Sequence, residues 1–273
     1  MTDTDETEAA STRTRRGVLA AAGTTIAVAL AGCQGGSDPP GAADTKERPD
    51  SEPTGGTPAP LELPDGTSES GIDDPAALIE ATQSALATTD YETASGLAQS
   101  DLTVDHARRS SLDDRRQLQV FDTEEERNEI FVADGTVHIR SERGGEITYS
   151  VTQTQQSFED RHRRSQLGGS ESLGGILEQG SYTPAETVRH NDRRVRSFAL
   201  GSAQLPSDDV SVIDAEGGLL VDADSVVHEA ILALEFEGEA GSETLDRRFT
   251  VSALGPLDVP EPEWVETARR RQG

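Results

Sequence analysis

From residue 91 onward, polar and apolar residues alternate in short runs separated by turn-forming pairs, and this pattern limits the folds open to the chain. The runs Gln117–Phe121, Asn128–Val132 and Thr136–Arg140 have a period of two, which is typical of a β-strand with one buried face. Asp134-Gly135 and Gly144-Gly145 stand between such runs, and both pairs favour tight hairpins. The pattern therefore predicts a mostly antiparallel sheet.

Further strands are expected on both sides of a gap. They are Tyr91–Ser95 and Ile147–Gln153 before it, and Arg194–Leu200, Leu219–Asp222, Val226–Phe236 and Arg247–Leu254 after it. The gap, about 157–187, is rich in Gly, and we expect it to hold one short helix or flap around Ile176 and Leu177.

One helix is predicted before the strands. Apolar residues recur at helical spacing from Ala77 to Leu86. Asp73 or Asp74 would serve as the N-cap, and Pro75 suits the first helical position.

These elements predict an α+β fold. An N-terminal helix precedes a mostly antiparallel sheet, either curved or closed into a half-open β-barrel, with a helical insertion. We expect a single β-rich globular domain over residues 73–268, followed by a tail, 269–273.

The chain is strongly acidic, and this excludes some partners. It has 51 Asp+Glu against 24 Lys+Arg, a formal net charge of −27, and one lysine, Lys46. Binding of nucleic acid through a basic face is therefore not expected. Acidity spread along the chain with almost no lysine resembles the proteins of salt-loving archaea, because at molar salt charges are screened within about 3 Å. A cation-binding protein is the alternative.

Residues 1–32 are similar to an export signal. Arg15 and Arg16 directly precede a run of small and apolar residues that ends at Gly32. The pair resembles a twin-arginine signal, which implies the twin-arginine export machinery as a partner. A transmembrane anchor is the alternative, but the run is shorter than the about 20 apolar residues that span a bilayer.

The run ends in Leu30, Ala31, Gly32 and Cys33, which resembles a lipobox. Cys33 is the only cysteine, so an internal disulfide framework is excluded. The resemblance implies a lipid on Cys33, attachment to the cell membrane, and an extracellular domain at the outer face of the cytoplasmic membrane. Residues 33–72 are rich in Pro, Gly, Ser and Thr, and after the lipidated cysteine we expect a disordered tether.

No catalytic, cofactor or metal site emerges from the motifs. The chain has no G-x-S-x-G sequence and no paired histidines at ligand spacing. Two arginine clusters stand out against the acidic background and could either bind an anionic group or pair with nearby carboxylates. They are Arg161, Arg163 and Arg164, and Arg193, Arg194 and Arg196. Asp222-Ala223-Asp224 is interpreted as a turn between two strands.

The mature chain as a whole resembles small haloarchaeal lipoproteins, including their acidic Pro-Trp ending in Leu254–Trp264. More distantly, the order of helix and meander resembles the lipoprotein-carrier fold of the LolA and LppX types. The resemblance implies a non-enzymatic, membrane-anchored surface lipoprotein that shelters a lipid or other apolar ligand in a half-barrel. The alternative is a structural or interaction protein of the cell envelope with no ligand cavity.

Overall fold

The computed structural model describes residues 62–165, 167–207, 210–238 and 241–272, with the backbone alone at 165, 167–170 and 272. The chain divides into two units, 1–56 and 57–273, and every described residue belongs to the second. The predicted signal with Arg15 and Arg16, the lipobox from Leu30 to Cys33, and most of the predicted tether lie outside the described residues.

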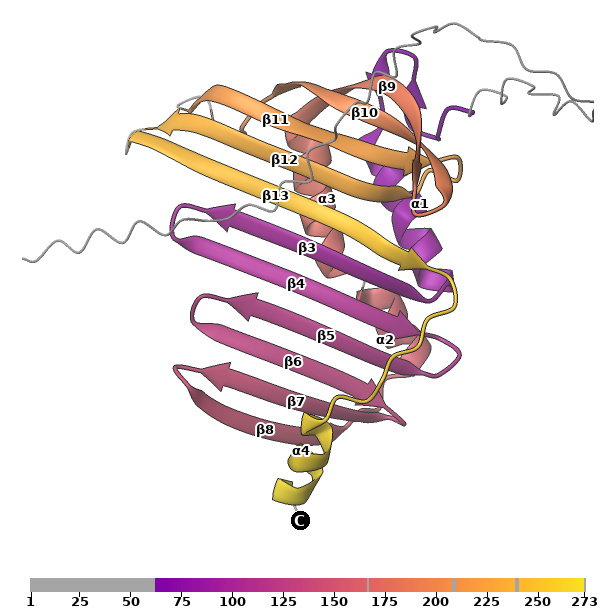
Figure 1. Ribbon diagram of the computed structural model, residues 1–273, viewed down its shortest axis with the longest axis vertical. Coiled ribbons are helices and arrows are strands. Elements are labelled where there is room, and N and C mark those ends of the chain that lie inside the picture. The colour runs from indigo at the N-terminus through magenta and orange to yellow at the C-terminus, as the bar shows by residue number, and fades with distance from the viewer. Residues whose placement is uncertain (1–61, 166, 208–209, 239–240, 273) are drawn as a thin grey trace, which may run out of the picture. The chain divides into compact units, whose positions relative to one another are not determined.

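Eleven strands of the described part form one antiparallel sheet (Figure 1). Six follow one another as a first meander: β3 (Tyr91–Gln99), β4 (Leu102–Ser111), β5 (Arg116–Thr123), β6 (Glu126–Ala133), β7 (Thr136–Arg143) and β8 (Glu146–Gln153). Five form a second: β9 (Gly180–His190), β10 (Arg193–Ala203), β11 (Ser211–Asp222), β12 (Val227–Gly238) and β13 (Gly241–Leu254). Two short strands, β1 (Thr67–Ser68) and β2 (Gly71–Ile72), pair with each other, and β2 contacts β9.

The last strand joins the two meanders. β13 pairs with β12 on one side and with β3 on the other, where Phe249 lies opposite Ser95. Within the described part of the chain the strand order is β8 to β3, then β13 to β9, so β8 and β9 are the edge strands and the sheet is open. The predicted α+β class with a mostly antiparallel sheet is confirmed. Asp134 and Gly135, with φ of 50° and 71°, form the predicted hairpin turn.

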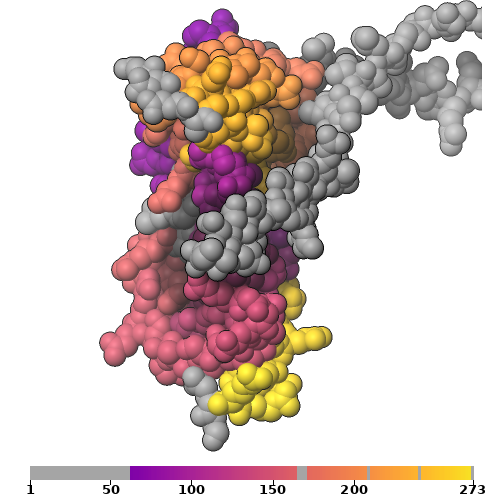
Figure 2. Space-filling model, turned by 90° about the vertical axis from the view of Figure 1, so that its left-hand side faces the viewer, coloured from indigo at the N-terminus to yellow at the C-terminus, as the bar shows by residue number. Residues whose placement is uncertain are grey.

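Three helices lie on one face of the sheet, behind it in Figure 1: α1 (Pro75–Thr88), α2 (Phe158–Ser165) and α3 (Leu167–Gln179). We call this the helix face. The opposite, outer face carries α4 (Trp264–Gln272). Figure 2 shows the same structure as a space-filling view, turned by 90° about the vertical axis from Figure 1. The predicted first helix is confirmed, because the Asp74 side chain accepts a hydrogen bond from the Ala77 amide at 3.2 Å.

The main hydrophobic core fills the space between the helices and the half of the sheet that β13 and its neighbours form. Leu78 of α1, Ile176 of α3 and Leu232 of β12 are fully buried there. Each such side chain contributes about 1.5–3 kcal/mol through burial. Thr82 fixes α1 to the sheet, since its Oγ1 accepts a hydrogen bond from the Val227 amide at 3.0 Å.

A smaller core lies on the outer face beneath the C-terminal segment. Phe131 of β6 packs there against Val259 and Val265. The Arg271 guanidinium lies 4.9 Å from the centre of the Tyr149 ring on β8. Residues 269–272, expected as a tail, therefore belong to the fold.

Other boundaries also differ from the prediction. Residues 62–72, assigned to the tether, contain β1 and β2. The gap at 157–187 holds two helices and the start of β9 in place of one short helix. β4 and β9 were not predicted, because their sequences mix polar and charged residues on both faces.

Candidate functional site

The helix face of β3, β4 and β5 carries side chains arranged in cross-strand rows, since residues directly opposite one another share a face. Within these rows the Arg108 position lies opposite Thr93 and Gln119, and His106 lies opposite Ser95 and Phe121. A cavity of about 190 Å³ opens here between the strands and α3. We call it the arginine pocket; its lining includes Leu97, Val104, His106, Phe121, Glu171 and Arg247.

Arg108 is an almost completely buried cation beside this pocket, with 6% of its surface exposed. Its Nη2 donates a hydrogen bond to His106 Nε2 at 3.2 Å. Its Nε is buried without an acceptor, and among the described residues no carboxylate forms an ion pair with it. Burial lowers the pKa of Arg108, yet a guanidinium remains charged in proteins. A buried charge without a counterion is costly, so this environment favours an added anion.

His106 supplies a neutral ring next to that cation. Burial, followed by the charge of Arg108, lowers the pKa of His106 to about 4. The ring is therefore uncharged at neutral pH and accepts a hydrogen bond at Nε2. It also meets the Phe121 ring edge-on, with 6.1 Å between the ring centres.

Arg247 brings a second guanidinium to the pocket, from β13. It lies against Gly175 of α3, where an added Cβ would stand 2.6 Å from Arg247 Nη1. The glycine thus lets α3 pass directly over the arginine. Arg247 Nε is buried without an acceptor, and within the described part of the chain no carboxylate pairs with this side chain.

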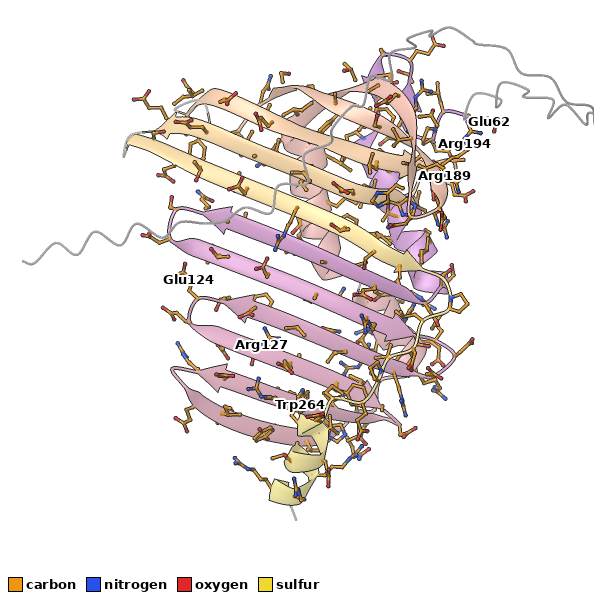
Figure 3. The ribbon with its side chains drawn as sticks, viewed as in Figure 1. Glu62, Glu124, Arg127, Arg189, Arg194 and Trp264 are labelled. Atoms are coloured by element: carbon orange, nitrogen blue, oxygen red, sulfur yellow. The ribbon has the colours of Figure 1, made fainter. Side chains whose placement is uncertain are left out.

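The arginines on the outer face of the same strands behave differently. Arg109 pairs with Glu92 at 2.7 Å and Arg248 with Asp105 at 2.5 Å. Farther along the sheet, Arg127 bonds to Glu129 at 2.9 Å on the face that also carries Trp264 (Figure 3). Arg109 and Arg248 directly follow Arg108 and Arg247 in sequence, so each pair places one matched and one unmatched arginine on opposite faces.

Apolar surface continues from the pocket across the helix face of the first meander. Phe121 is 42% exposed, which is high for a phenylalanine on the inner side of a sheet. Ile130 of β6 and Ile139 of β7 lie opposite each other and are half-buried. The pocket therefore has the Arg247 guanidinium in its lining, the buried Arg108 guanidinium beside it, and an adjoining apolar strip.

A buried Asp–His pair lies at the turn between β11 and β12. Asp222 accepts hydrogen bonds from His228 Nε2 at 2.8 Å and from the Val226 amide at 3.0 Å. Burial acts to raise the pKa of Asp222, but these hydrogen bonds outweigh it and lower the pKa. A cavity of about 340 Å³ adjoins His228 and Arg193. The predicted turn at Asp222-Ala223-Asp224 is confirmed, and the pair serves to close it.

Another buried histidine, His162, also has a structural role. His162 of α2 bonds to Ser110 Oγ at 2.8 Å and to the Leu86 carbonyl at 2.9 Å, which ties three elements together. Burial lowers the pKa of His162. Among the described residues, no three His, Cys, Asp or Glu side chains are placed to hold a metal ion. None of the described helices is long and apolar enough to cross a membrane.

The two arginine clusters noted in the sequence are divided in the structure. Arg193 and Arg194 are neighbours on β10 and so face opposite sides of the sheet. Arg193 lies 3.8 Å from Asp222, while Arg163 lies 3.9 Å from Asp160. Arg161 and Arg164 belong to α2, and Arg161 lines a separate cavity of about 220 Å³. Arg196 lies on β10 with its Nε buried and without an acceptor.

Sequence reasoning missed the arginine pocket. The run Leu102–Ser111 was not recognised as a strand, so no face could be assigned to Arg108. The signal that was present is the pair of consecutive arginines, at 108–109 and at 247–248, because consecutive strand residues always point to opposite faces.

The family model of DUF7537, described as a family of unknown function, matches residues 19–268. No curated protein matches the chain in sequence.

Three solved structures show weak likeness to the chain. MucB is 14% identical with a TM-score of 0.30, covering 70% of this chain and 62% of MucB. The MucA/MucB complex of Pseudomonas aeruginosa is 15% identical with a TM-score of 0.29, and the match covers 70% of this chain and 60% of that one. A putative outer membrane lipoprotein-sorting protein domain from Vibrio parahaemolyticus is 6% identical with a TM-score of 0.19, and the match covers 69% of this chain and 96% of that one. The chain thus spans about three fifths of the MucB chains, and TM-scores this low support no argument about function.

Proposed function

Since the chain belongs to DUF7537, a family of unknown function, we propose its function from its own residues. It is a non-enzymatic, lipid-anchored envelope protein whose helix face shelters an apolar or amphipathic ligand. Cys33 carries the lipid, and the domain lies outside the cell at the outer face of the cytoplasmic membrane. The twin-arginine machinery reads Arg15 and Arg16. The support for the anchor is the signal-like run that ends at the only cysteine.

The observation that carries ligand binding is the apolar surface left open on the helix face. α1 and α3 contact β12, and α3 also contacts β3, β9 and β13, whereas Phe121 on β5 is 42% exposed beside the pocket. Small-molecule sites usually enclose about 300–1,000 Å³. The arginine pocket is smaller, so the ligand extends from it along the open strip that Ile130 and Ile139 continue.

A second candidate function is an envelope interaction protein without a ligand cavity. It is favoured by the main core, in which Leu78, Ile176 and Leu232 fill the space under the helices. Under this alternative, the exposed strip contacts another protein.

Replacement of Cys33 tests the anchor. Cys33→Ser should release the protein from its host's membrane fraction into the medium, because the thiol that accepts the lipid is gone. Replacing Arg15-Arg16 by Lys-Lys should instead retain the chain inside the cell. A Cys33→Ser protein that stays with the membrane would refute the anchor.

Native mass spectrometry of protein purified from its own host tests the ligand. The wild type should carry a lipid-sized adduct, and Phe121→Asp should lose it because a charge enters the apolar strip. Ile231→Asp is the matched control, since Ile231 is similarly exposed, at 44%, but lies on β12 facing outward. A wild type without any adduct would favour the interaction protein.

A further inference from the structure

Two arginines of the helix face, Arg108 and Arg247, lack a carboxylate partner among the described residues, and this bears on the chemistry of the ligand. The chain has 51 acidic against 24 basic residues, so acidic side chains outnumber basic ones about two to one. Outer-face neighbours Arg109 and Arg248 both have a carboxylate partner, at 2.7 and 2.5 Å. Among the described residues, Arg108 and Arg247 have none.

Arg108 is buried in surroundings that leave one of its hydrogen-bond donors, Nε, without an acceptor. The side chain is 6% exposed, and among the described residues its one hydrogen bond goes to the neutral ring of His106. A buried donor without a partner is destabilising, and more so when it belongs to a charged group.

Arg247, which lines the pocket, also has a hydrogen-bond donor without an acceptor. Its Nε is also buried without an acceptor, and it is held against α3 at Gly175. Glu171, one helical turn before Gly175 on α3, also lines the pocket, but in the described chain it forms no ion pair with Arg247. The guanidinium therefore faces the cavity with unused hydrogen-bonding capacity.

We propose that the arginine pocket binds the anionic group of an amphipathic ligand, a carboxylate or phosphate, while its hydrocarbon chain lies along Phe121, Ile130 and Ile139. Arg247, which lines the pocket, supplies charge-assisted hydrogen bonds, which are the stronger kind and match planar or tetrahedral oxyanions. Arg108, buried beside the pocket and bonded to His106, adds its positive charge to the site. This inference rests on the proposed sheltering function and names its ligand class.

The test uses the purified full chain in molar KCl with a fluorescent long-chain acid, 11-(dansylamino)undecanoic acid, and its methyl ester. The acid should bind with saturable enhancement of dansyl fluorescence, and the ester should bind at least about tenfold more weakly because it lacks the charge. Dodecyl phosphate should displace the acid, which tests the phosphate form of the head group. Inorganic phosphate should not, because it has no chain to lie on the apolar strip.

Substitutions locate the anionic group. Arg108→Gln and Arg247→Gln should each weaken binding of the acid about tenfold or more and leave the ester unchanged. Arg109→Gln and Arg248→Gln are the matched controls, because each removes a neighbouring arginine on the other face. Should Arg108→Gln fail to fold, Arg247→Gln alone decides.

The outcomes separate the two proposals. Equal binding of acid and ester, with both pocket variants unaffected, would overturn the anionic site but leave ligand sheltering intact. Displacement by inorganic phosphate as effective as by dodecyl phosphate would overturn the role of the apolar strip. Absence of binding by both acid and ester would count against the sheltering function as well.

Discussion

Thr82 offers the sharpest test of how α1 is held to the sheet. The side chain is 1% exposed. Its Oγ1 accepts from the Val227 amide at 3.0 Å and donates to the Leu78 carbonyl at 2.8 Å. Thr82→Val keeps the shape but removes the acceptor, so the buried Val227 amide loses its partner.

The magnitude follows from two opposing effects. An unsatisfied buried amide costs about 1–3 kcal/mol, and the added methyl group recovers up to about 0.8 kcal/mol. We therefore expect the free energy of unfolding to fall by about 1–2 kcal/mol. For a unit of this size, that corresponds to a fall in Tm of roughly 2–8 °C. Thermal and denaturant unfolding followed by circular dichroism in molar KCl measure both quantities.

The matched control is Thr88→Val on the same helix. Thr88 also donates to a carbonyl one turn earlier, Ser84 at 3.1 Å, but it is exposed. This variant should stay within about 0.5 kcal/mol of the wild type. If Thr82→Val is as stable as the wild type, or Thr88→Val loses as much, the proposed tie between α1 and β12 does not hold.

Two further predictions concern the buried polar groups. Asp222→Ala should lower the free energy of unfolding, measured by denaturant titration, by at least about 2 kcal/mol, because the donors of His228 and Val226 lose a charged acceptor. Asp224 is an exposed neighbour, so Asp224→Ala should leave the free energy of unfolding nearly unchanged. Because burial lowers the pKa of folded His162, the unfolded chain takes up the proton first, so stability falls as the pH drops below about 6.5. His162→Asn should show a smaller loss between pH 7.5 and 5.5 than the wild type, and an equal loss would contradict this assignment.

Much of the fold could be predicted from local pattern. The Asp134-Gly135 turn, the capped start of α1 and most strands follow from short-range preferences that the structure keeps. β4 escaped prediction because Arg108 is buried on one face while Arg109, half-buried, forms an ion pair on the other. Without an apolar alternation, only tertiary pairing identifies such a strand.

The candidate site was less accessible to sequence reasoning. Its residues come from β3, β4, β5, α3 and β13, which are far apart in the chain. Whether an arginine is matched depends on which face it occupies and on what lies opposite. The spacing of Arg247 and Gly175 in sequence gives no hint that α3 crosses directly over that guanidinium.

The place of β13 has a consequence for how the protein is made. This strand, Gly241–Leu254, lies between β3 and β12, yet it is synthesised after all the other strands of the sheet. Until β13 is made, β3 and β12 each lack a pairing partner on one side. Joining the two meanders then requires contacts between residues more than 140 positions apart in sequence. Such distant pairing slows folding. A chain that terminates before β13 would leave two separate half-sheets with unpaired strand edges, which favour aggregation.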